Sequence, residues 1–267
     1  MNNKHYAYES PFKMKDKEGV EYTLEIKRDD CPESPRSWDN VCTMVCWHRH
    51  YSLGDKHYYS DSDEFFDYIL REICGMDEEK VEVLSTREKY KLAKESDKVY
   101  FKDLNLYDHS GLTISTSSCY PYNDRWDAGC VGWIYVSKEK AMSEWGGVPE
   151  YDENGEFIRI PHEHPSGQVT YSIKYTPITD ENWKECAEYH MDGEVDIYDQ
   201  YLRGDVYGFK LTKKVVEQET CPHCGEIIRE YEEEEEVDSC WGFYGDCLEE
   251  NGILDNLSSD LKFTEEE

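Results

Sequence analysis

Short stretches of the chain alternate between hydrophobic and polar residues, and these stretches predict β-strands. Tyr, Leu and Ile alternate with polar residues at 22–27, and the run at 130–140 is the most strand-like of the chain. Residues 106–116 predict two strands joined by a turn at Gly111. Further strands are expected at 41–51 and 168–175, with two short ones in 194–211 on either side of Arg203 and Gly204.

Hydrophobic residues at helical spacing predict a helix over 62–75, begun by a cap at Ser62 or Asp63 and ended by Gly75. Shorter helices are expected at 138–145 and from the cap at Thr179 or Asp180 to residue 189. The highly charged, weakly periodic segment 77–98 predicts an exposed helix or a lid-like excursion.

Strands and helices therefore mix without a regular βαβ alternation. This pattern predicts an α+β fold with a mainly antiparallel sheet and a few short helices. The 267 residues suit one large domain or two small ones. Residues 212–267 hold 18 acidic against 4 basic side chains, so we expect a core domain at 1–211 and an acidic C-terminal hairpin and tail at 212–267, packed separately or as one domain.

Charge narrows the function classes. The 29 basic and 60 acidic residues give a net charge of −31, which opposes non-specific nucleic-acid binding and an anionic membrane surface. No apolar run approaches the ~18 residues of a membrane span, and the first residues lack the apolar core of a signal peptide. We therefore expect a cytoplasmic protein whose 11 cysteines are mostly reduced.

Four cysteines near the C-terminus have spacing that is typical of a zinc site. Cys221, Cys224, Cys240 and Cys247 follow the pattern C-x2-C-x15-C-x6-C, and four sulfur ligands satisfy tetrahedral zinc. The first pair predicts a knuckle at the tip of a hairpin formed by 215–219 and 226–231. The six residues within the second pair exceed the usual two to four, so a plain hairpin with reduced cysteines is the alternative to structural zinc.

A second candidate is the histidine-rich segment at the end of the predicted strand 41–51. His48 and His50 share one strand face, and a turn at Gly54 and Asp55 folds His57 back toward them. Two imidazoles and a carboxylate suit a divalent transition metal. The same residues, with Arg49 holding an anion, suit acid–base chemistry. A polar strand end with solvated histidines is the third interpretation.

Two further polar clusters contain candidate catalytic residues. Asp108 and His109 are adjacent, so on a strand they face opposite sides and do not orient each other as in a catalytic triad. Asp205 belongs to a segment rich in tyrosine that either lines a pocket or forms a hairpin with cross-strand tyrosine pairs. The enzyme hypothesis brings the following residues to one pocket: His48, Arg49, His57, Asp108, His109 and Asp205.

An acidic run continues the predicted C-terminal hairpin. It consists of Glu232, Glu233, Glu234, Glu235, Glu236 and Asp238. On a strand, alternate carboxylates form two rows at about 6–7 Å spacing, similar to the phosphates of a nucleic-acid strand. The run therefore suits a partner-binding surface that mimics DNA. The alternative is a solvated face that prevents edge-to-edge aggregation.

Several runs together resemble a known family. They are SPRSWDNVCTMVCWHRHYSLGDKH, LYDHSGLTIST, GCVGWIYVSKEK, EVDIYDQYLRGDVYGF and DSCWGFYGD. These resemble small acidic proteins encoded by tailed phages and prophages, mainly of Gram-positive bacteria. The resemblance implies an accessory gene product that acts in the cytoplasm of the bacterial host. Such products are often inhibitors of host defence or metabolism.

Two functions follow as hypotheses. The first is an accessory protein that binds and inhibits a host defence or nucleic-acid-handling protein. It would occupy a basic surface of that host protein by acidic DNA mimicry. It would not itself contact nucleic acid or membrane. The alternative is a metal-dependent enzyme that acts on a nucleotide or nucleic acid through the His, Asp and Arg pocket. The sequence does not indicate an oligomeric state.

Overall fold

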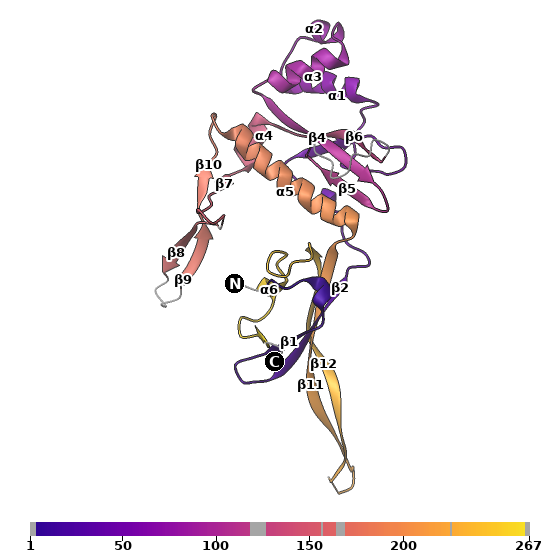
Figure 1. Ribbon diagram of the computed structural model, residues 1–267, viewed down its shortest axis with the longest axis vertical. Helices are drawn as coiled ribbons and strands as arrows, with labels where there is room; N and C mark the ends of the chain where they lie inside the picture. The colour runs from indigo at the N-terminus through magenta and orange to yellow at the C-terminus, as the bar shows by residue number, and fades with distance from the viewer. Residues whose placement is uncertain (1–3, 118–126, 156, 164–168, 225, 265–267) are drawn as a thin grey trace. The chain divides into compact units, whose positions relative to one another are not determined.

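The computed structural model describes residues 4–117, 127–155, 157–163, 169–224 and 226–264 (Figure 1). Its fold is α+β, with mainly antiparallel sheets and few helices, which confirms the predicted class. The chain forms two compact units, Arg36–Asp199 and Met1–Pro35 with Gln200–Glu267. None of the described helices is long and apolar enough to cross a membrane.

The Arg36–Asp199 unit is built on a four-stranded antiparallel sheet in the order β3, β6, β4, β5. The strand bounds are Thr43–Cys46 for β3, Val99–Asp108 for β4, Leu112–Ser115 for β5 and Ala128–Ser137 for β6. The strands predicted at 106–116 and 130–140 are confirmed here. β3 is shorter than the predicted run 41–51 because the chain leaves the sheet at Trp47.

Helices cover one face of this sheet. The helix predicted at 62–75 is present as α1 (Ser62–Tyr68) and a π-helical turn (Ile69–Ile73), and the Asp61 carboxylate accepts the N–H groups of its first turn. Phe65, Phe66, Ile69 and Leu70 are buried against Val45 and Phe101 of the sheet. The charged segment 77–98 forms α2 (Glu78–Glu82) and α3 (Thr86–Glu95), and α3 packs on α1.

A single long helix, α5 (Trp183–Arg203), contacts the opposite face. Lys102, which points away from Phe101 by strand alternation, bonds the carboxylates of Glu188 and Asp192 on α5. The prediction that the helix ends at 189 and that strands fill 194–211 was therefore wrong in part. Val195 and Tyr198 continue the buried helical stripe that begins at Trp183, and packing against the sheet outweighs the local alternation.

The rest of this unit consists of a helix and two strand pairs. Helix α4 (Lys138–Glu144) follows β6 directly, as predicted, with the Ser137 side chain as its cap. β7 (Gly147–Pro149) pairs with β10 (Tyr175–Pro177), and β8 (Arg159–Glu163) pairs with β9 (Val169–Ile173). The predicted strand 168–175 corresponds to β9 and the start of β10 within the described residues.

The other unit contains a five-stranded sheet in the order β12, β11, β2, β1, β13. The bounds are Phe12–Lys15 (β1), Glu21–Arg28 (β2), Val206–Thr220 (β11), Ile227–Tyr244 (β12) and Lys262–Phe263 (β13), with the short helix α6 at Ile253–Asn256. The predicted strand 22–27 is thus confirmed as β2. Leu24 and Phe209 are buried in its core together with Leu248 and Ile253.

The β11–β12 hairpin extends well beyond its neighbour in the sheet (Figure 1). β11 pairs with β2 only as far as Lys213, whereas it pairs with β12 along its whole length to Thr220. We call residues 214–234, beyond the last pair with β2, the ribbon. β11 also crosses the domain boundary expected at 211/212 without interruption, so residues 206–220 form one continuous element.

Candidate functional site

The histidine-rich segment leaves β3 after Cys46 and folds back on the strand at the predicted turn. The prediction that His48 and His50 share one strand face was wrong, because both lie beyond the end of β3. Asp55 N–H donates to the Met44 carbonyl at 2.8 Å, and Gly54 bridges to Val45. Gly54 has φ +69°, and a Cβ there would lie 2.7 Å from the Met44 oxygen, so only glycine fits this turn. The turn brings His57 to Cys46, whose carbonyl lies 2.9 Å from the His57 Nε2.

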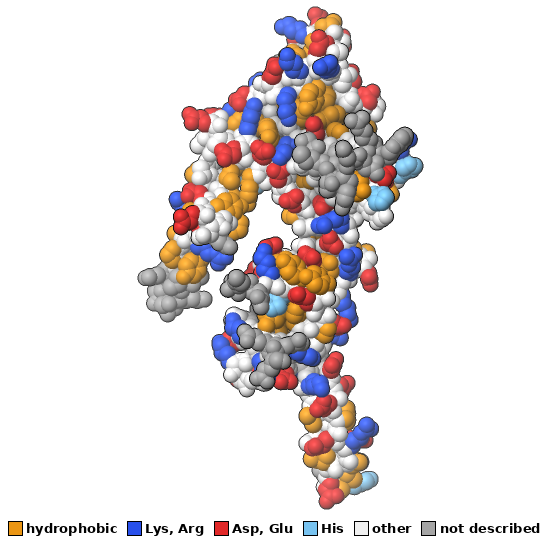
Figure 2. Space-filling view, viewed as in Figure 1, with side chains coloured by type: hydrophobic (Ala, Val, Ile, Leu, Met, Phe, Trp, Pro, Cys, Tyr) orange, Lys and Arg blue, Asp and Glu red, His pale blue; other side chains and the backbone are white. Residues whose placement is uncertain are grey.

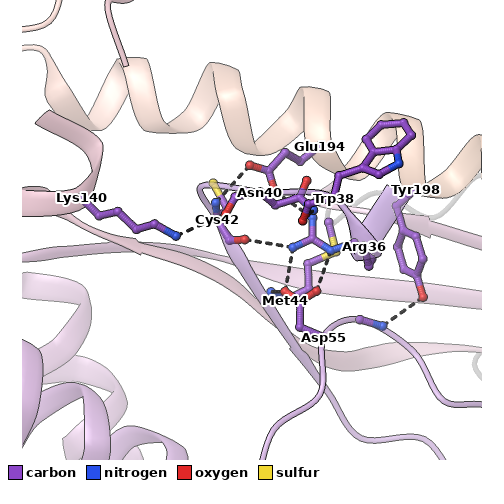
Figure 3. A network of polar contacts seen from close by, with 10 residues as sticks. Arg36, Trp38, Asn40, Cys42, Met44, Asp55, Lys140, Glu194 and Tyr198 are labelled. Atoms are coloured by element: carbon purple, nitrogen blue, oxygen red, sulfur yellow. Dashed lines mark hydrogen bonds and ion pairs between the residues drawn. The ribbon is translucent and has the colours of Figure 1, made fainter. Parts of the chain in front are cut away.

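A buried arginine holds this turn in place (Figure 3). Arg36 is 5% exposed; its Nε and Nη2 donate to the two Asp55 oxygens at 2.9 and 2.7 Å, and its Nη1 donates to Glu194 of α5 at 2.8 Å. Asp55 also accepts the Met44 N–H, and Glu194 accepts the Cys42 N–H. The network therefore joins β3, the turn and α5, and it positions the segment that follows β3.

Two adjoining depressions lie at this end of the sheet. The larger, about 660 Å³, is lined by the segment itself, including His48, Arg49 and His57. The smaller, about 260 Å³, is lined by His48 and Arg49 together with Asp108 from β4 and Asp127 before β6. The structure thus brings together Asp108 and the histidine-rich segment, which the sequence had placed in separate clusters.

The hydrogen bonds of two histidines define their proton positions. His48 Nδ1 lies 3.3 Å from the N–H groups of both His50 and Tyr51 and accepts from them, so the proton of the neutral ring is on Nε2. The His109 Nδ1–H donates to Asp127 Oδ2 at 3.0 Å, which leaves Nε2 as the basic nitrogen. One imidazole is thus arranged as a donor and the other as a base.

Sequence reasoning missed Asp127 as the partner of His109. The two residues are 18 positions apart, and only the pairing of β4 with β6 brings them together, through the Tyr107–Ala128 register. The adjacent Asp108 does not orient His109, as strand alternation predicted. Ser110 in the same turn has φ +61°, which is uncommon for a residue with a side chain.

His57 lines only the larger depression, with His48 and Arg49, whereas Asp205 lines neither. The His57 ring lies edge-on to Trp47 and stacks on Tyr59, so it is part of the wall of the larger depression. Asp205 belongs to the other compact unit, where its carboxylate contacts Arg28 at 3.2 Å and Arg203 at 3.4 Å.

Cys46 also lines the larger depression, beside the histidines. Burial raises the pKa of Cys46 to about 12. Burial therefore opposes formation of a thiolate at Cys46.

The predicted acidic row lies on β12 and faces lysines of β11. Glu232 pairs with Lys214 at 2.9 Å, and Glu235 pairs with Lys213 at 3.0 Å. Lys210 and Ser239 bond Glu236 and hold the pKa of that carboxyl below its ordinary value. In the described part of the chain, no ion pair engages the Glu233, Glu234 or Asp238 carboxylates. The row is therefore partly neutralised within the hairpin.

The four predicted zinc ligands are not brought together within one chain. Cys221 and Cys224 lie at the hairpin tip, whereas Cys240 lies on β12 opposite Phe209. Cys247 is buried and forms an isolated backbone β-bridge with Tyr6. Eleven residues of strand separate Phe209 from Thr220, which corresponds to about 36 Å. Among the described residues, no group of three or more His, Cys, Asp or Glu side chains is placed to hold a metal ion. Zinc binding stays a prediction.

The two tip cysteines form a local pair. The backbone N–H groups of His223 and Cys224 and the Cys224 side chain hold the pKa of Cys221 below its ordinary value. The Cys224 thiol donates to the Glu226 carboxylate at 3.8 Å. The turn is closed by the Cys221 N–H, which donates to the Glu226 carbonyl at 2.8 Å.

Comparisons with family models, with curated proteins and with solved structures give no match for this chain.

Proposed function

We propose that this is a phage-encoded accessory protein that binds and inhibits a host nucleic-acid-handling or defence protein, using the ribbon as its docking element. The exposure of the ribbon carries this proposal. Every residue of β12 from Ile227 to Ser239 is exposed, so this strand adds little to a core. An isolated two-stranded hairpin is only marginally stable in water. A binding role explains why this two-stranded hairpin extends so far beyond the rest of its sheet.

The composition of the ribbon supports a basic partner. Residues 214–234 hold seven acidic and two basic side chains, a net charge of −5. Figure 2 shows acidic, basic and hydrophobic side chains interspersed along the hairpin, and exposed Ile228, Tyr231 and Val237 lie between the carboxylates. Carboxylates steer a basic surface into contact, while the apolar side chains supply area to bury. In this proposal the protein acts in the host cytoplasm and contacts neither nucleic acid nor membrane.

Neutralising two of the three row carboxylates for which the described residues provide no ion pair tests the proposal. The double variant Glu233→Gln with Glu234→Gln is expected to bind its partner about tenfold more weakly, because each exposed charge contact is worth up to ~1 kcal/mol. The measurement is recovery of a basic host protein by the tagged chain at about 0.05 M salt, followed by titration of the complex at rising salt.

The matched control is Glu79→Gln with Glu82→Gln, which makes the same change of net charge on the exposed helix α2. This control should bind like the unaltered protein. Equal weakening by both double variants would assign the effect to net charge rather than to the ribbon. Binding that does not change between low and high salt would refute acidic mimicry.

The smaller depression favours a second candidate, an enzyme that acts on a nucleotide or nucleic acid with a metal supplied from solution. Arg49 and His48 line this depression; Arg49 suits a phosphate group, and the His48 Nε2–H suits a donor to a leaving oxygen. His109 does not line it, but it is bonded to Asp127, which does, and its Nε2 suits a general base. Asp127 is a positioning residue, since it acts through His109.

If this second candidate holds, His109→Asn lowers hydrolysis of an activated nitrophenyl phosphodiester by roughly 10²- to 10⁴-fold, the usual contribution of a general base. The assay supplies Mg²⁺ or Mn²⁺, and it records kcat and KM separately, because loss of a base lowers kcat. His162→Asn, which changes an exposed histidine on β8, is the control. Absence of turnover by the unaltered protein removes this candidate.

A further inference from the structure

The larger depression beside β3 differs in charge from the rest of the chain. The chain carries a net charge of −31, but the depression is lined by five basic or imidazole side chains, His48, Arg49, His50, Lys56 and His57. Among its described lining residues Asp55 is the one carboxylate, and Arg36 donates to both of its oxygens. The charge that this depression offers to a ligand is therefore positive.

The two cations of the depression are available to a ligand. Arg49 and Lys56 are exposed, and within the described ranges of the chain no carboxylate forms an ion pair with either of them. Other cations of the same unit are engaged by the abundant carboxylates, as when Lys102 and Lys138 each contact two. In a chain with 60 acidic and 29 basic residues, two accessible cations in one depression suit an anionic ligand.

Hydrogen bonds hold the backbone that carries these cations. Where the segment leaves β3, Trp47 N–H donates to the Val131 carbonyl at 2.8 Å, and at the turn Arg36 bonds Asp55. Between these points His48 Nδ1 accepts two backbone N–H groups, which leaves its Nε2–H as a donor. The depression is therefore formed before a ligand arrives, and this lowers the entropy cost of binding.

An anion is expected to prefer the larger depression to the smaller one. Arg49 lines both, but the smaller is also lined by Asp108 and Asp127, whose charges repel a phosphate. The larger depression has Lys56 in addition to Arg49. A guanidinium bonds two phosphate oxygens at once, and an ammonium adds a compact point charge. These two side chains therefore indicate a phosphate group.

The same depression offers aromatic rings beside the cations. Tyr58 lines it and is 100% exposed, so its ring is open to stacking, and Tyr51, which is 41% exposed, stacks on His48 with ring centroids 5.1 Å apart. A nucleobase stacks on aromatic side chains of this kind. The volume of about 660 Å³ is typical of a small-molecule site. A phosphate joined to a flat base, as in a nucleotide, matches these features.

We propose that the larger depression binds a nucleoside monophosphate, with the phosphate on Arg49 and Lys56 and the base on Tyr58. The His48 Nε2–H is a further donor to the phosphate oxygens. Binding breaks and forms no covalent bond, so it requires neither a metal nor turnover at His109. The inference is also independent of docking by the ribbon.

Calorimetric titration of the full chain with each of the four ribonucleoside monophosphates, in the presence of a chelator, tests the proposal. We expect one-to-one binding of at least one of them. It should be tighter than binding of ribose 5-phosphate, inorganic phosphate or the nucleoside alone, because the site uses both phosphate and base. No binding, or equal binding of nucleotide and inorganic phosphate, would overturn the proposal. Tighter binding of a single-stranded oligonucleotide would overturn it as well, since the site would then belong to nucleic acid.

Removing the two cations tests the phosphate contact. Arg49→Gln with Lys56→Gln is expected to weaken nucleotide binding by roughly tenfold, because each exposed charge contact contributes up to about fivefold. The matched control is Lys80→Gln with Arg87→Gln, which removes two exposed cations from α2 and α3 and changes the net charge equally. Equal weakening by the two double variants would refute a phosphate site in the depression.

A tyrosine variant tests the base contact separately. Tyr58→Ala is expected to weaken nucleotide binding about fivefold or more and to leave ribose 5-phosphate binding unchanged. Tyr8→Ala, which alters a tyrosine that is 76% exposed in the other unit, should change neither. Equal loss of both ligands in Tyr58→Ala would refute the base contact. The ribbon variant Glu233→Gln with Glu234→Gln should bind the nucleotide normally, so failure of this site is distinguishable from failure of docking.

Discussion

Replacing Arg36 by methionine is expected to lower the free energy of unfolding of the Arg36–Asp199 unit by about 3–5 kcal/mol. The substitution leaves the Asp55 and Glu194 carboxylates, which are 20 and 17% exposed, facing each other without the cation that bonds both. Removing one partner of a buried ion pair lowers the free energy of unfolding by more than the pair itself contributes to it. The reason is that the remaining charges stay desolvated without a partner.

Urea unfolding followed by tryptophan fluorescence measures this loss. Six of the seven tryptophans lie in the Arg36–Asp199 unit, so the signal reports on it. Arg71→Met removes the exposed Arg71–Glu78 pair and is the control, with an expected loss below about 1 kcal/mol. Adding Glu194→Gln to the Arg36 variant should recover part of the stability, since it removes one stranded charge. Similar losses for the two arginines would refute a structural role of the network.

Substituting Gly132 by alanine is expected to destabilise the same unit by about 3 kcal/mol or more, because the added Cβ meets backbone rather than a movable side chain. The new atom would lie 1.9 Å from the Val45 carbonyl oxygen and 2.8 Å from the Cys46 Cα. Gly132 lies in β6 opposite Cys46, at the shift in register between β6 and β4. A glycine inside a strand is typical of such a close backbone approach.

Gly129→Ala is a matched control on the same strand, because nothing lies within 4 Å of the Cβ it would add. Thermal unfolding of the two variants should therefore differ strongly, with the loss confined to Gly132→Ala. The same variant should also disturb the histidine segment, since Trp47 N–H donates to the Val131 carbonyl at 2.8 Å beside this site. Equal stability of the two alanine variants would contradict the close approach.

Local patterns predicted most of the elements whose burial follows a simple period. The strand at 22–27 and the helix at 62–75 are present because the apolar residues of each recur at the period of that element. In each case these residues face a single core, and the two cores are different. The segment 194–203 has apolar residues at both periods. Its helical form is decided by contacts from sequence-distant groups, such as Arg36 with Glu194 and Gly54 with Tyr198.

The candidate sites divide in the same way. Residue types and short spacings were enough to predict the turn at Gly54 and the hairpin with Cys221 and Cys224 at its tip. They were not enough to predict that β12 continues as a strand past Glu236, which carries Cys240 away from the tip. The number of residues between two cysteines does not determine the distance between their sulfur atoms. That distance depends on whether the backbone between them is extended or folded.

The sequence by itself determined the fold class, the acidic character, the hairpin tip and the histidine segment, because these depend on composition and on neighbours a few residues apart. Only the tertiary structure decided which groups meet. It paired His109 with Asp127, joined Asp108 to His48, assigned Asp205 to the other unit and separated Cys240 from the tip. These outcomes depend on strand register and chain reversal, which arise from packing summed over many distant residues rather than from any local pattern.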